Sequence, residues 1–147
     1  MNDKEFHEIR RKGIGGSDIA AIMGMDKWRS PMDVWLEKTG RADPKDETTM
    51  TRHGHLMEPI ILDMYAERHG LKKPRRQVFK SHPKYKFHRA SLDMVAGPVV
   101  VDAKAPRYFS REWGEPGTDM VPDYILLQQQ WYLILPQFRR AYRRSKK

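Results

Sequence analysis

The stretch Ala90-Ser91-Leu92-Asp93-Met94-Val95-Ala96-Gly97-Pro98-Val99-Val100-Val101-Asp102-Ala103-Lys104 decides how the middle of this chain folds. Apolar residues dominate both halves, and the Gly97-Pro98 pair between them favours a turn, so the pattern predicts a β-hairpin. A symmetric pairing about this turn places Asp93 opposite residue 101 or 102. If the partner is Asp102, the two Cβ atoms lie roughly 5 Å apart on one face, and Lys104 points to the same side. One face of the hairpin is therefore charged, and the other is apolar and suits a core.

The charged face allows two interpretations. Two ionised carboxylates roughly 5 Å apart repel each other by about 3 kcal/mol at an effective dielectric constant near ~20, so a positive charge must compensate. Lys104 neutralises one carboxylate, whereas a divalent cation with oxygen ligands neutralises both and supplies chemistry, which indicates Mg²⁺ or Mn²⁺. On geometry alone, a solvated hairpin edge with an ordinary Asp–Lys pair is the more frequent arrangement.

Two short helices are predicted before the hairpin. The segment Gly13-Ile14-Gly15-Gly16-Ser17-Asp18 indicates a flexible turn, with Ser17 as the N-cap of a helix over residues 19–23 that Gly24 closes. A second helix begins at Ser30-Pro31 and stops before Gly40, because serine is a preferred N-cap and proline is favoured at the first helical position.

A third helix is predicted between a polar loop at 41–51 and Gly70. Apolar residues recur at helical spacing from Leu56 to Tyr65, with Glu58 among them. Pro59 removes one backbone hydrogen bond, so we expect a kink there or a late helix start at Glu58.

The remaining elements are β-structure and one more helix. The period changes to alternation from Val78 onward, and an irregular stretch covers 107–118. Pro122-Asp123 then opens a final helix, whose members include Tyr124, Leu127, Gln128, Trp131 and Leu135. The predicted order is therefore helices, strands, helix.

Composition limits the class of protein. The 147 residues, 39% of them hydrophobic, suit a single domain over 1–147. The absence of cysteine excludes disulfides and thiolate sites, and His53 and His55 are interpreted as surface residues rather than zinc ligands. No apolar run approaches the roughly 18 residues of a membrane span, so a soluble, intracellular protein is expected. The net charge of +9, with a basic tail at 137–147, favours a polyanionic partner.

Five segments in order resemble the YqaJ-type viral recombinase family, relatives of phage lambda exonuclease within the PD-(D/E)xK nuclease superfamily. The likeness spans about residues 6 to 135. The matching segments are Arg10 with Gly13-Ile14-Gly15-Gly16-Ser17-Asp18; Ser30-Pro31 with Trp35-Leu36-Glu37-Lys38-Thr39-Gly40; Gly54 to Glu58-Pro59; Ser91-Leu92-Asp93 with Asp102-Ala103-Lys104-Ala105-Pro106; and Gln128-Gln129-Gln130-Trp131-Tyr132-Leu133. A lone Asp-x-Lys recurs by chance, whereas five ordered matches are specific.

The resemblance implies an α/β (α+β) fold with a restriction-endonuclease-like core, in which helices flank a central mixed β-sheet. It further implies metal-dependent phosphodiester hydrolysis. Asp93 and Asp102 would hold Mg²⁺, or Mn²⁺ as a substitute, with the carbonyl of Ala103 and with Glu58 directly or through water. Lys104 would orient the attacking water and stabilise charge on the phosphate. Asp102 stands where many relatives have glutamate, which the superfamily pattern tolerates.

The resemblance also assigns roles to three residues outside the hairpin. Gln128 would reach the bound water or neighbouring ligands, against the alternative of a solvent-facing helical glutamine. Arg10 and Ser17 would contact DNA phosphate, the latter at a glycine-led helix start that presents free backbone N–H groups. The alternatives are a solvated arginine and a plain N-cap.

The resulting hypothesis is a phage-type exonuclease acting on double-stranded DNA ends in recombination, cytoplasmic in a bacterial host and encoded by a phage or prophage. Assembly into a homo-oligomer and a single-strand annealing partner would accompany this function. Relatives continue past the glutamine helix, so the chain is expected to be a minimal or C-terminally truncated version. A DNA-binding module with weak or no catalysis is the rival, and a phage protein with a protein partner fits the basic tail poorly. The intact set Glu58, Asp93, Asp102 and Lys104 favours the nuclease.

Overall fold

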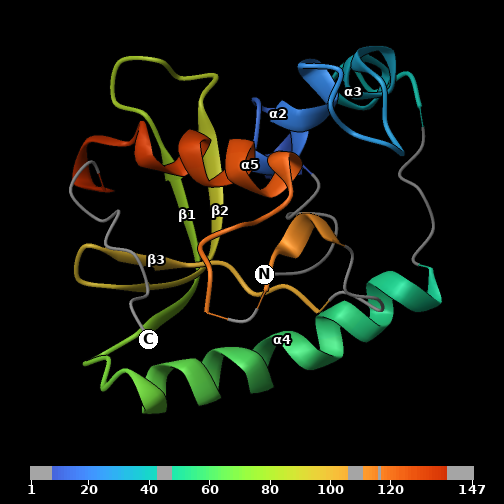
Figure 1. The fold of residues 1–147 in the computed structure, drawn as a ribbon. Coiled ribbons are helices and arrows are strands. Elements are labelled where there is room, and N and C mark those ends of the chain that lie inside the picture. The colour runs from blue at the N-terminus through green and yellow to red at the C-terminus, as the bar shows by residue number, and fades with distance from the viewer. Residues whose placement is uncertain (1–7, 43–47, 106–110, 116, 139–147) are drawn as a thin grey trace.

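The computed structural model describes residues 8–42, 48–105, 111–115 and 117–138 of the chain, so the basic segment from 139 onward lies outside the described residues. Helices surround a small antiparallel sheet (Figure 1). The elements are α2 (Gly16–Ile22), α3 (Pro31–Lys38), α4 (Thr49–Arg68), β1 (Arg75–Ser81), β2 (Arg89–Ala96), β3 (Val99–Val101), η1 (Arg111–Trp113), α5 (Asp123–Leu133) and η2 (Pro136–Phe138). This order confirms the predicted α+β fold, with helices first, then strands, then a helix.

The caps of the first two helices differ in how well the sequence predicts them. Ser30 caps α3 as expected, because its side chain accepts the Asp33 backbone N–H at 3.2 Å. Ser17 was wrongly predicted to cap α2, whose N-cap is Gly15. The Asp18 carboxylate accepts the Gly15 backbone N–H at 2.8 Å, and this bond starts the helix two residues earlier. Ser17 therefore lies in the first turn with an exposed side chain.

Helix α4 is longer than predicted. It begins at Thr49, because the Thr48 side chain accepts the Thr51 backbone N–H at 3.2 Å, so the expected loop ends earlier than residue 51. The late start at Glu58 is wrong, since the helix continues through Pro59. Burial of Leu62 one turn later fixes the second half of α4 on the sheet, and this packing offsets the backbone hydrogen bond that proline removes.

The strands form one sheet in the order β1-β2-β3. Gly97, with a φ of 58°, makes the turn between β2 and β3, and the paired residues run from Ala96–Val99 to Met94–Val101. The next pair in this register is Asp93 and Asp102, as the hairpin pattern predicts. All three strands are antiparallel, and a parallel contact occurs only as the isolated bridge between Ile14 and His88 among the described residues.

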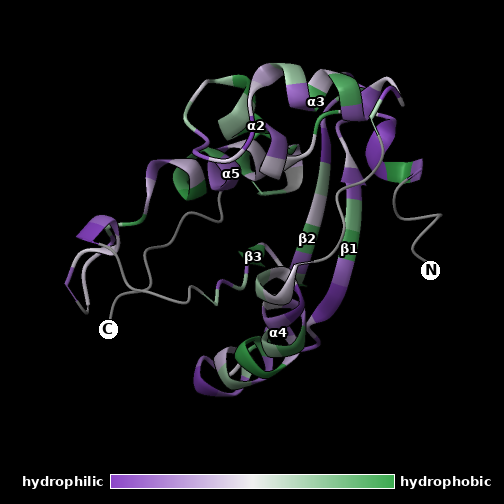
Figure 2. Ribbon diagram, turned by 90° about the vertical axis from the view of Figure 1, so that its right-hand side faces the viewer, coloured by the Kyte–Doolittle hydropathy of each residue, from purple (hydrophilic) through white to green (hydrophobic). Residues whose placement is uncertain are grey.

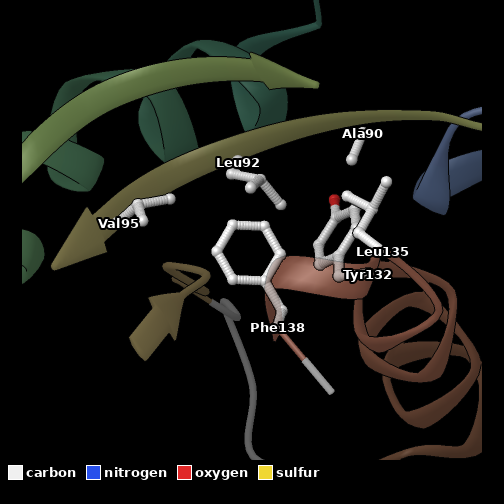
Figure 3. Close-up of a cluster of buried hydrophobic side chains, with 6 residues drawn as sticks. All are labelled: Ala90, Leu92, Val95, Tyr132, Leu135 and Phe138. Atoms are coloured by element: carbon white, nitrogen blue, oxygen red, sulfur yellow. The ribbon is translucent and has the colours of Figure 1, made fainter. Parts of the chain in front are cut away.

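Two apolar cores lie on opposite sides of the sheet. The first joins β2 to α5 and the turn after it (Figure 3), through Ala90, Leu92, Val95, Tyr132, Leu135 and Phe138. The second joins β2 and β3 to α4, through Leu62, Met94 and Val101, with Val99 and Ala103 packed against it. The apolar face of the hairpin is therefore a core face, as predicted.

The arrangement separates α4 from the other helices. Helix α4 lies at one end of the strands, and α2 and α3 lie near the other end with α5 (Figure 2). Among the described residues, no helix combines the length and the apolar character that a bilayer span requires.

Candidate active site

A cavity of about 440 Å³ lies where α2, α4, α5 and the sheet meet. Its wall includes all eight residues that the sequence assigned to a site. These residues are Arg10, Ser17, Glu58, Asp93, Asp102, Ala103, Lys104 and Gln128. Residues separated by more than a hundred positions in the sequence thus surround one space.

The acid pair occupies the wall formed by the hairpin. Asp93 lies in β2, and its Oδ2 accepts the Ala103 backbone N–H at 2.8 Å. Asp102 follows β3, and its Oδ2 lies 2.7 Å from Nζ of Lys104. That Oδ2 atom is buried and, within the described residues, has no hydrogen-bond partner of ordinary geometry. The ammonium of Lys104 therefore compensates part of the charge of the pair.

The pKa of Asp93 is raised from 3.8 to about 7, because burial removes solvent from the carboxylate and Asp102 and Glu58 add negative charge nearby. The Ala103 N–H and Lys104 oppose this shift. A carboxylate pair with such electrostatics is stabilised by any cation that reaches it.

Gln128 of α5 is held beside Asp102 by a short chain of hydrogen bonds. Its Nε2 donates to Oδ1 of Asp102 at 3.1 Å and to Oη of Tyr132 at 2.7 Å. The Tyr132 hydroxyl donates to the Ser91 carbonyl at 3.1 Å. Burial raises the pKa of the Tyr132 phenol, so the hydroxyl keeps its proton. The chain connects α5 to β2 and fixes one oxygen of Asp102.

Close packing of α2 on α5 supports this chain. A Cβ atom at Gly16 would lie 2.5 Å from Cε1 of Tyr132 and 3.0 Å from Cγ of Gln128. Only glycine permits this approach, because real Cβ atoms do not come so near to other heavy atoms. The glycine-rich motif therefore shapes the α5 wall as well as starting α2.

The N-terminal corner of the cavity is basic and anchored. Nη2 of Arg10 donates to Oγ of Ser17 at 3.1 Å, and Nζ of Lys38 donates to the Arg10 carbonyl at 2.8 Å. Lys38 also pairs with the fully buried Asp18 at 2.6 Å, and Arg29 pairs with the same carboxylate at 3.1 Å. These hydrogen bonds and ion pairs therefore hold the positively charged side chains of this corner in place.

Glu58 reaches the cavity from α4, where it is half-buried. Its charge raises the pKa of Asp93, yet within the described residues no three histidine or acidic side chains cluster closely enough to form a metal site by themselves. Asp93 and Asp102 are therefore the two acids that lie together, and Glu58 acts on them from the α4 side of the cavity.

Several wall residues were missed by the sequence analysis. They are Lys38, Lys80, Arg89, Ser91 and Tyr132. Two signals could have found some of them. Arg89 and Ser91 alternate with Asp93 along β2, and Lys38, Ser91 and Tyr132 lie inside segments that resemble the family.

Comparisons with known proteins agree with the resemblance. The family model described as "YqaJ-like viral recombinase domain" matches residues 5–138. The uncharacterized protein YqaJ of Bacillus subtilis (strain 168) is 34% identical over 97% of this chain, which covers 46% of that protein. The uncharacterized protein R354 of Acanthamoeba polyphaga mimivirus is 26% identical over 93% of this chain and 27% of its own length.

The chain spans less than half the length of either relative. The family match nevertheless covers all eight of the site residues named above. The chain therefore belongs to the YqaJ-like viral recombinase domain family.

Proposed function

We propose that this domain is a divalent-cation-dependent nuclease that hydrolyses phosphodiester bonds of DNA. The observation that carries the proposal is the cavity, which collects all eight sequence-assigned residues around an acid pair whose charge Lys104 compensates only in part. Membership of a viral recombinase family supports DNA as the substrate and a nuclease in general.

The donor set of the cavity fits one hard cation. Asp93 and Asp102 supply carboxylate oxygens, the buried Oδ2 of Asp102 lacks a hydrogen-bond partner of ordinary geometry among the described residues, and the chain has no cysteine to favour a softer metal. The Ala103 carbonyl is a further candidate ligand, and Glu58 acts directly or through water. Mg²⁺, or Mn²⁺ in its place, would polarise the scissile phosphate and acidify a water molecule there.

Two further side chains assist the reaction, Lys104 directly and Gln128 through Asp102. Lys104 orients the attacking water and stabilises negative charge on the phosphate oxygens. Gln128 restrains Oδ1 of Asp102, which leaves the other oxygen to the cation and Lys104. Water would add to phosphorus as one ester P–O bond breaks. The proton of the water would pass to solvent or a wall carboxylate, and the departing ester oxygen would take up a proton from solvent.

The basic corner suits the sugar-phosphate chain. Arg10 and Ser17 lie on one wall of the same cavity as the acid pair, and Lys38 lies beside them. A phosphate bound there would fix the strand relative to the acid pair. On the family resemblance, we further propose that the enzyme is an exonuclease that acts on double-stranded DNA ends in recombination, forms a homo-oligomer and works with a single-strand annealing protein.

Cleavage of linear and closed-circular double-stranded DNA with Mg²⁺, Mn²⁺ or EDTA tests the proposal. Wild type should degrade linear DNA only with metal, and Lys104→Ala should lose on the order of 100-fold or more in rate, because it removes a charge that acts on the transition state. Lys72→Ala, an exposed lysine outside the cavity, is the matched control.

The outcomes separate the nuclease from its rival. Survival of circles alongside loss of linear DNA supports a requirement for an end. A folded protein that binds DNA in a salt-sensitive manner but cleaves neither form with either metal would instead be a DNA-binding module.

A further inference from the structure

Strand β2 changes faces at one point along its length. Ala90, Leu92 and Val95 all point toward α5 (Figure 3), at a spacing of two and then three residues. Side chains of a regular strand alternate, so Met94 should share the face of Leu92. Met94 instead packs with Leu62 of α4 on the other side of the sheet. The switch therefore falls between residues 92 and 94.

Strand β1 switches at the same level. Val78 packs in the core beneath α5, whereas the side chain of Arg76 bonds Asp63 of α4. These two positions are also two residues apart, so a regular strand would place them on one face. Gln77 lies between these two residues. In the register of the two strands, it is opposite Asp93.

The backbone of Gln77 accounts for the switch. Its φ is 47°, in the left-handed region that residues with a Cβ atom rarely adopt. The β1–β2 ladder pairs Arg76 with Met94 and Val78 with Leu92, but the pair between them is missing from this described part of the sheet. The Gln77 side chain is exposed, so the position requires a backbone conformation rather than a side-chain contact.

The change of faces affects the orientation of Asp93. The Asp93 carboxylate accepts the Ala103 N–H at 2.8 Å and faces Asp102 in the cavity wall. Met94, the next residue, is fully buried against α4. Asp93 thus lies at the switch itself, between Leu92 in the α5 core and Met94 in the α4 core.

We propose that Gln77 is a positioning residue, whose left-handed backbone turns both strands at the level of Asp93 so that this carboxylate faces Asp102 while Met94 stays in the α4 core. The inference rests on the proposed function only where Asp93 is called a metal ligand. The orientation of the carboxylate can be measured in the metal-free protein.

A substitution series at Gln77 tests the proposal. Gln77→Gly and Gln77→Asn accept a left-handed backbone, whereas Gln77→Val, with its branched Cβ, strongly disfavours it. The first readout is hydrogen exchange of the Ala103 amide in metal-free protein, since this amide bonds Asp93. The second readout is Mn²⁺ affinity by calorimetry.

We expect glycine and asparagine to keep both readouts at the wild-type level. Valine should speed exchange of the Ala103 amide and weaken Mn²⁺ binding, each by about tenfold. Lys73→Val is the matched control, because Lys73 has a φ of 50° outside β1 and away from Asp93. It should lower stability and leave both readouts unchanged.

The proposal is overturned if Gln77→Val leaves the Ala103 amide protected, or if Lys73→Val exposes it equally. Should valine prevent folding, Gln77→Thr, which is also branched at Cβ but polar, replaces it and must change the exchange of the Ala103 amide in the same direction. A wild-type protein that binds no Mn²⁺ would refute the proposed metal site, and the exchange of the Ala103 amide would still decide the role of Gln77.

Discussion

Two acidic sites in this molecule illustrate opposite uses of burial. Asp18 is fully buried, and although burial alone raises its pKa, bonds from Lys38, the Gly15 N–H and Arg29 outweigh it and lower the pKa below 3.8. Asp93 is also largely desolvated, and this burial together with the charge of the neighbouring Asp102 raises its pKa to about 7. The protein's own cations thus stabilise the ionised form of Asp18. The ionised form of Asp93 would instead be stabilised by a bound cation.

Asp18→Asn should give the largest loss of stability. Removal of one partner leaves Lys38 and Arg29 close together and largely buried, which costs about 3–5 kcal/mol in the free energy of unfolding by urea at pH 7. Because the folded-state pKa of Asp18 is depressed, its contribution is present above about pH 4 and disappears as pH falls through the folded-state pKa. The difference between wild type and variant should therefore shrink in acid.

A control ion pair calibrates this result. Asp63 pairs with Arg76 on the surface, with its side chain 77% exposed, so Asp63→Asn should change stability by about 1 kcal/mol or less. Equal losses at Asp18 and Asp63 would contradict the view that Asp18 is a structural centre.

Asp93→Asn should change stability in the opposite direction. A folded-state pKa raised to about 7 means that the folded protein holds a proton that the unfolded chain releases, so stability falls as pH rises from about 4 to about 7. The metal-free variant, which has no charge to bury, should therefore gain up to roughly 4 kcal/mol over wild type at pH 8. The gain should vanish below pH 4.

Added Mg²⁺ sharpens this second prediction. It should stabilise wild type more at pH 8 than at pH 5 and should have little effect on Asp93→Asn. A variant less stable than metal-free wild type at pH 8 would mean that the acid pair is not under electrostatic strain.

Gly16→Ala should have an intermediate effect. The new methyl group would overlap the Tyr132 ring, so we expect a loss of about 1–3 kcal/mol in thermal or urea unfolding, together with slower cleavage. Gly54→Ala is the matched control for stability alone, because a Cβ at this helical position meets no atom within 4 Å although Gly54 also lines the cavity. It should be stabilising by up to about 1 kcal/mol.

Tyr132→Phe should have the smallest effect on stability, about 1 kcal/mol, since the ring stays in the core and only the hydroxyl bonds to Gln128 and Ser91 are lost. Its effect on Mn²⁺ affinity should be larger than that of Tyr124→Phe on the same helix. Equal affinities in the two variants would show that the hydrogen-bond chain does not restrain Asp102.

Local patterns in the sequence predicted most of this fold. Gly97 set the register that brings Asp93 opposite Asp102, and Ser30-Pro31 set the start of α3. The two errors have different causes. The first turn of α2 is set by the Asp18 carboxylate, which bonds Gly15 three residues earlier and is also held by the more distant Lys38 and Arg29. The helix through Pro59 is retained by packing on the sheet, which no local pattern shows.

The candidate site was likewise predictable in part from the sequence and in part only from the folded structure. The resemblance located the eight residues, and their meeting in one cavity depends on contacts that no short pattern contains. The hydrogen bond from Gln128 to Asp102 and the close approach of Gly16 to α5 need the folded sheet. A left-handed glutamine in β1 has no signature in the sequence, because glycine or asparagine is the usual residue there.

The bridge between Ile14 and His88 affects how the protein folds while it is being synthesised. It joins segments 74 positions apart, and Gln128 completes the cavity only after a further 40 residues have been synthesised. At about 5–20 residues per second, an emerging chain spends several seconds with its N-terminal motif exposed but without an assembled centre. The candidate site therefore assembles only after Gln128, which bonds Asp102 from α5, has left the ribosome.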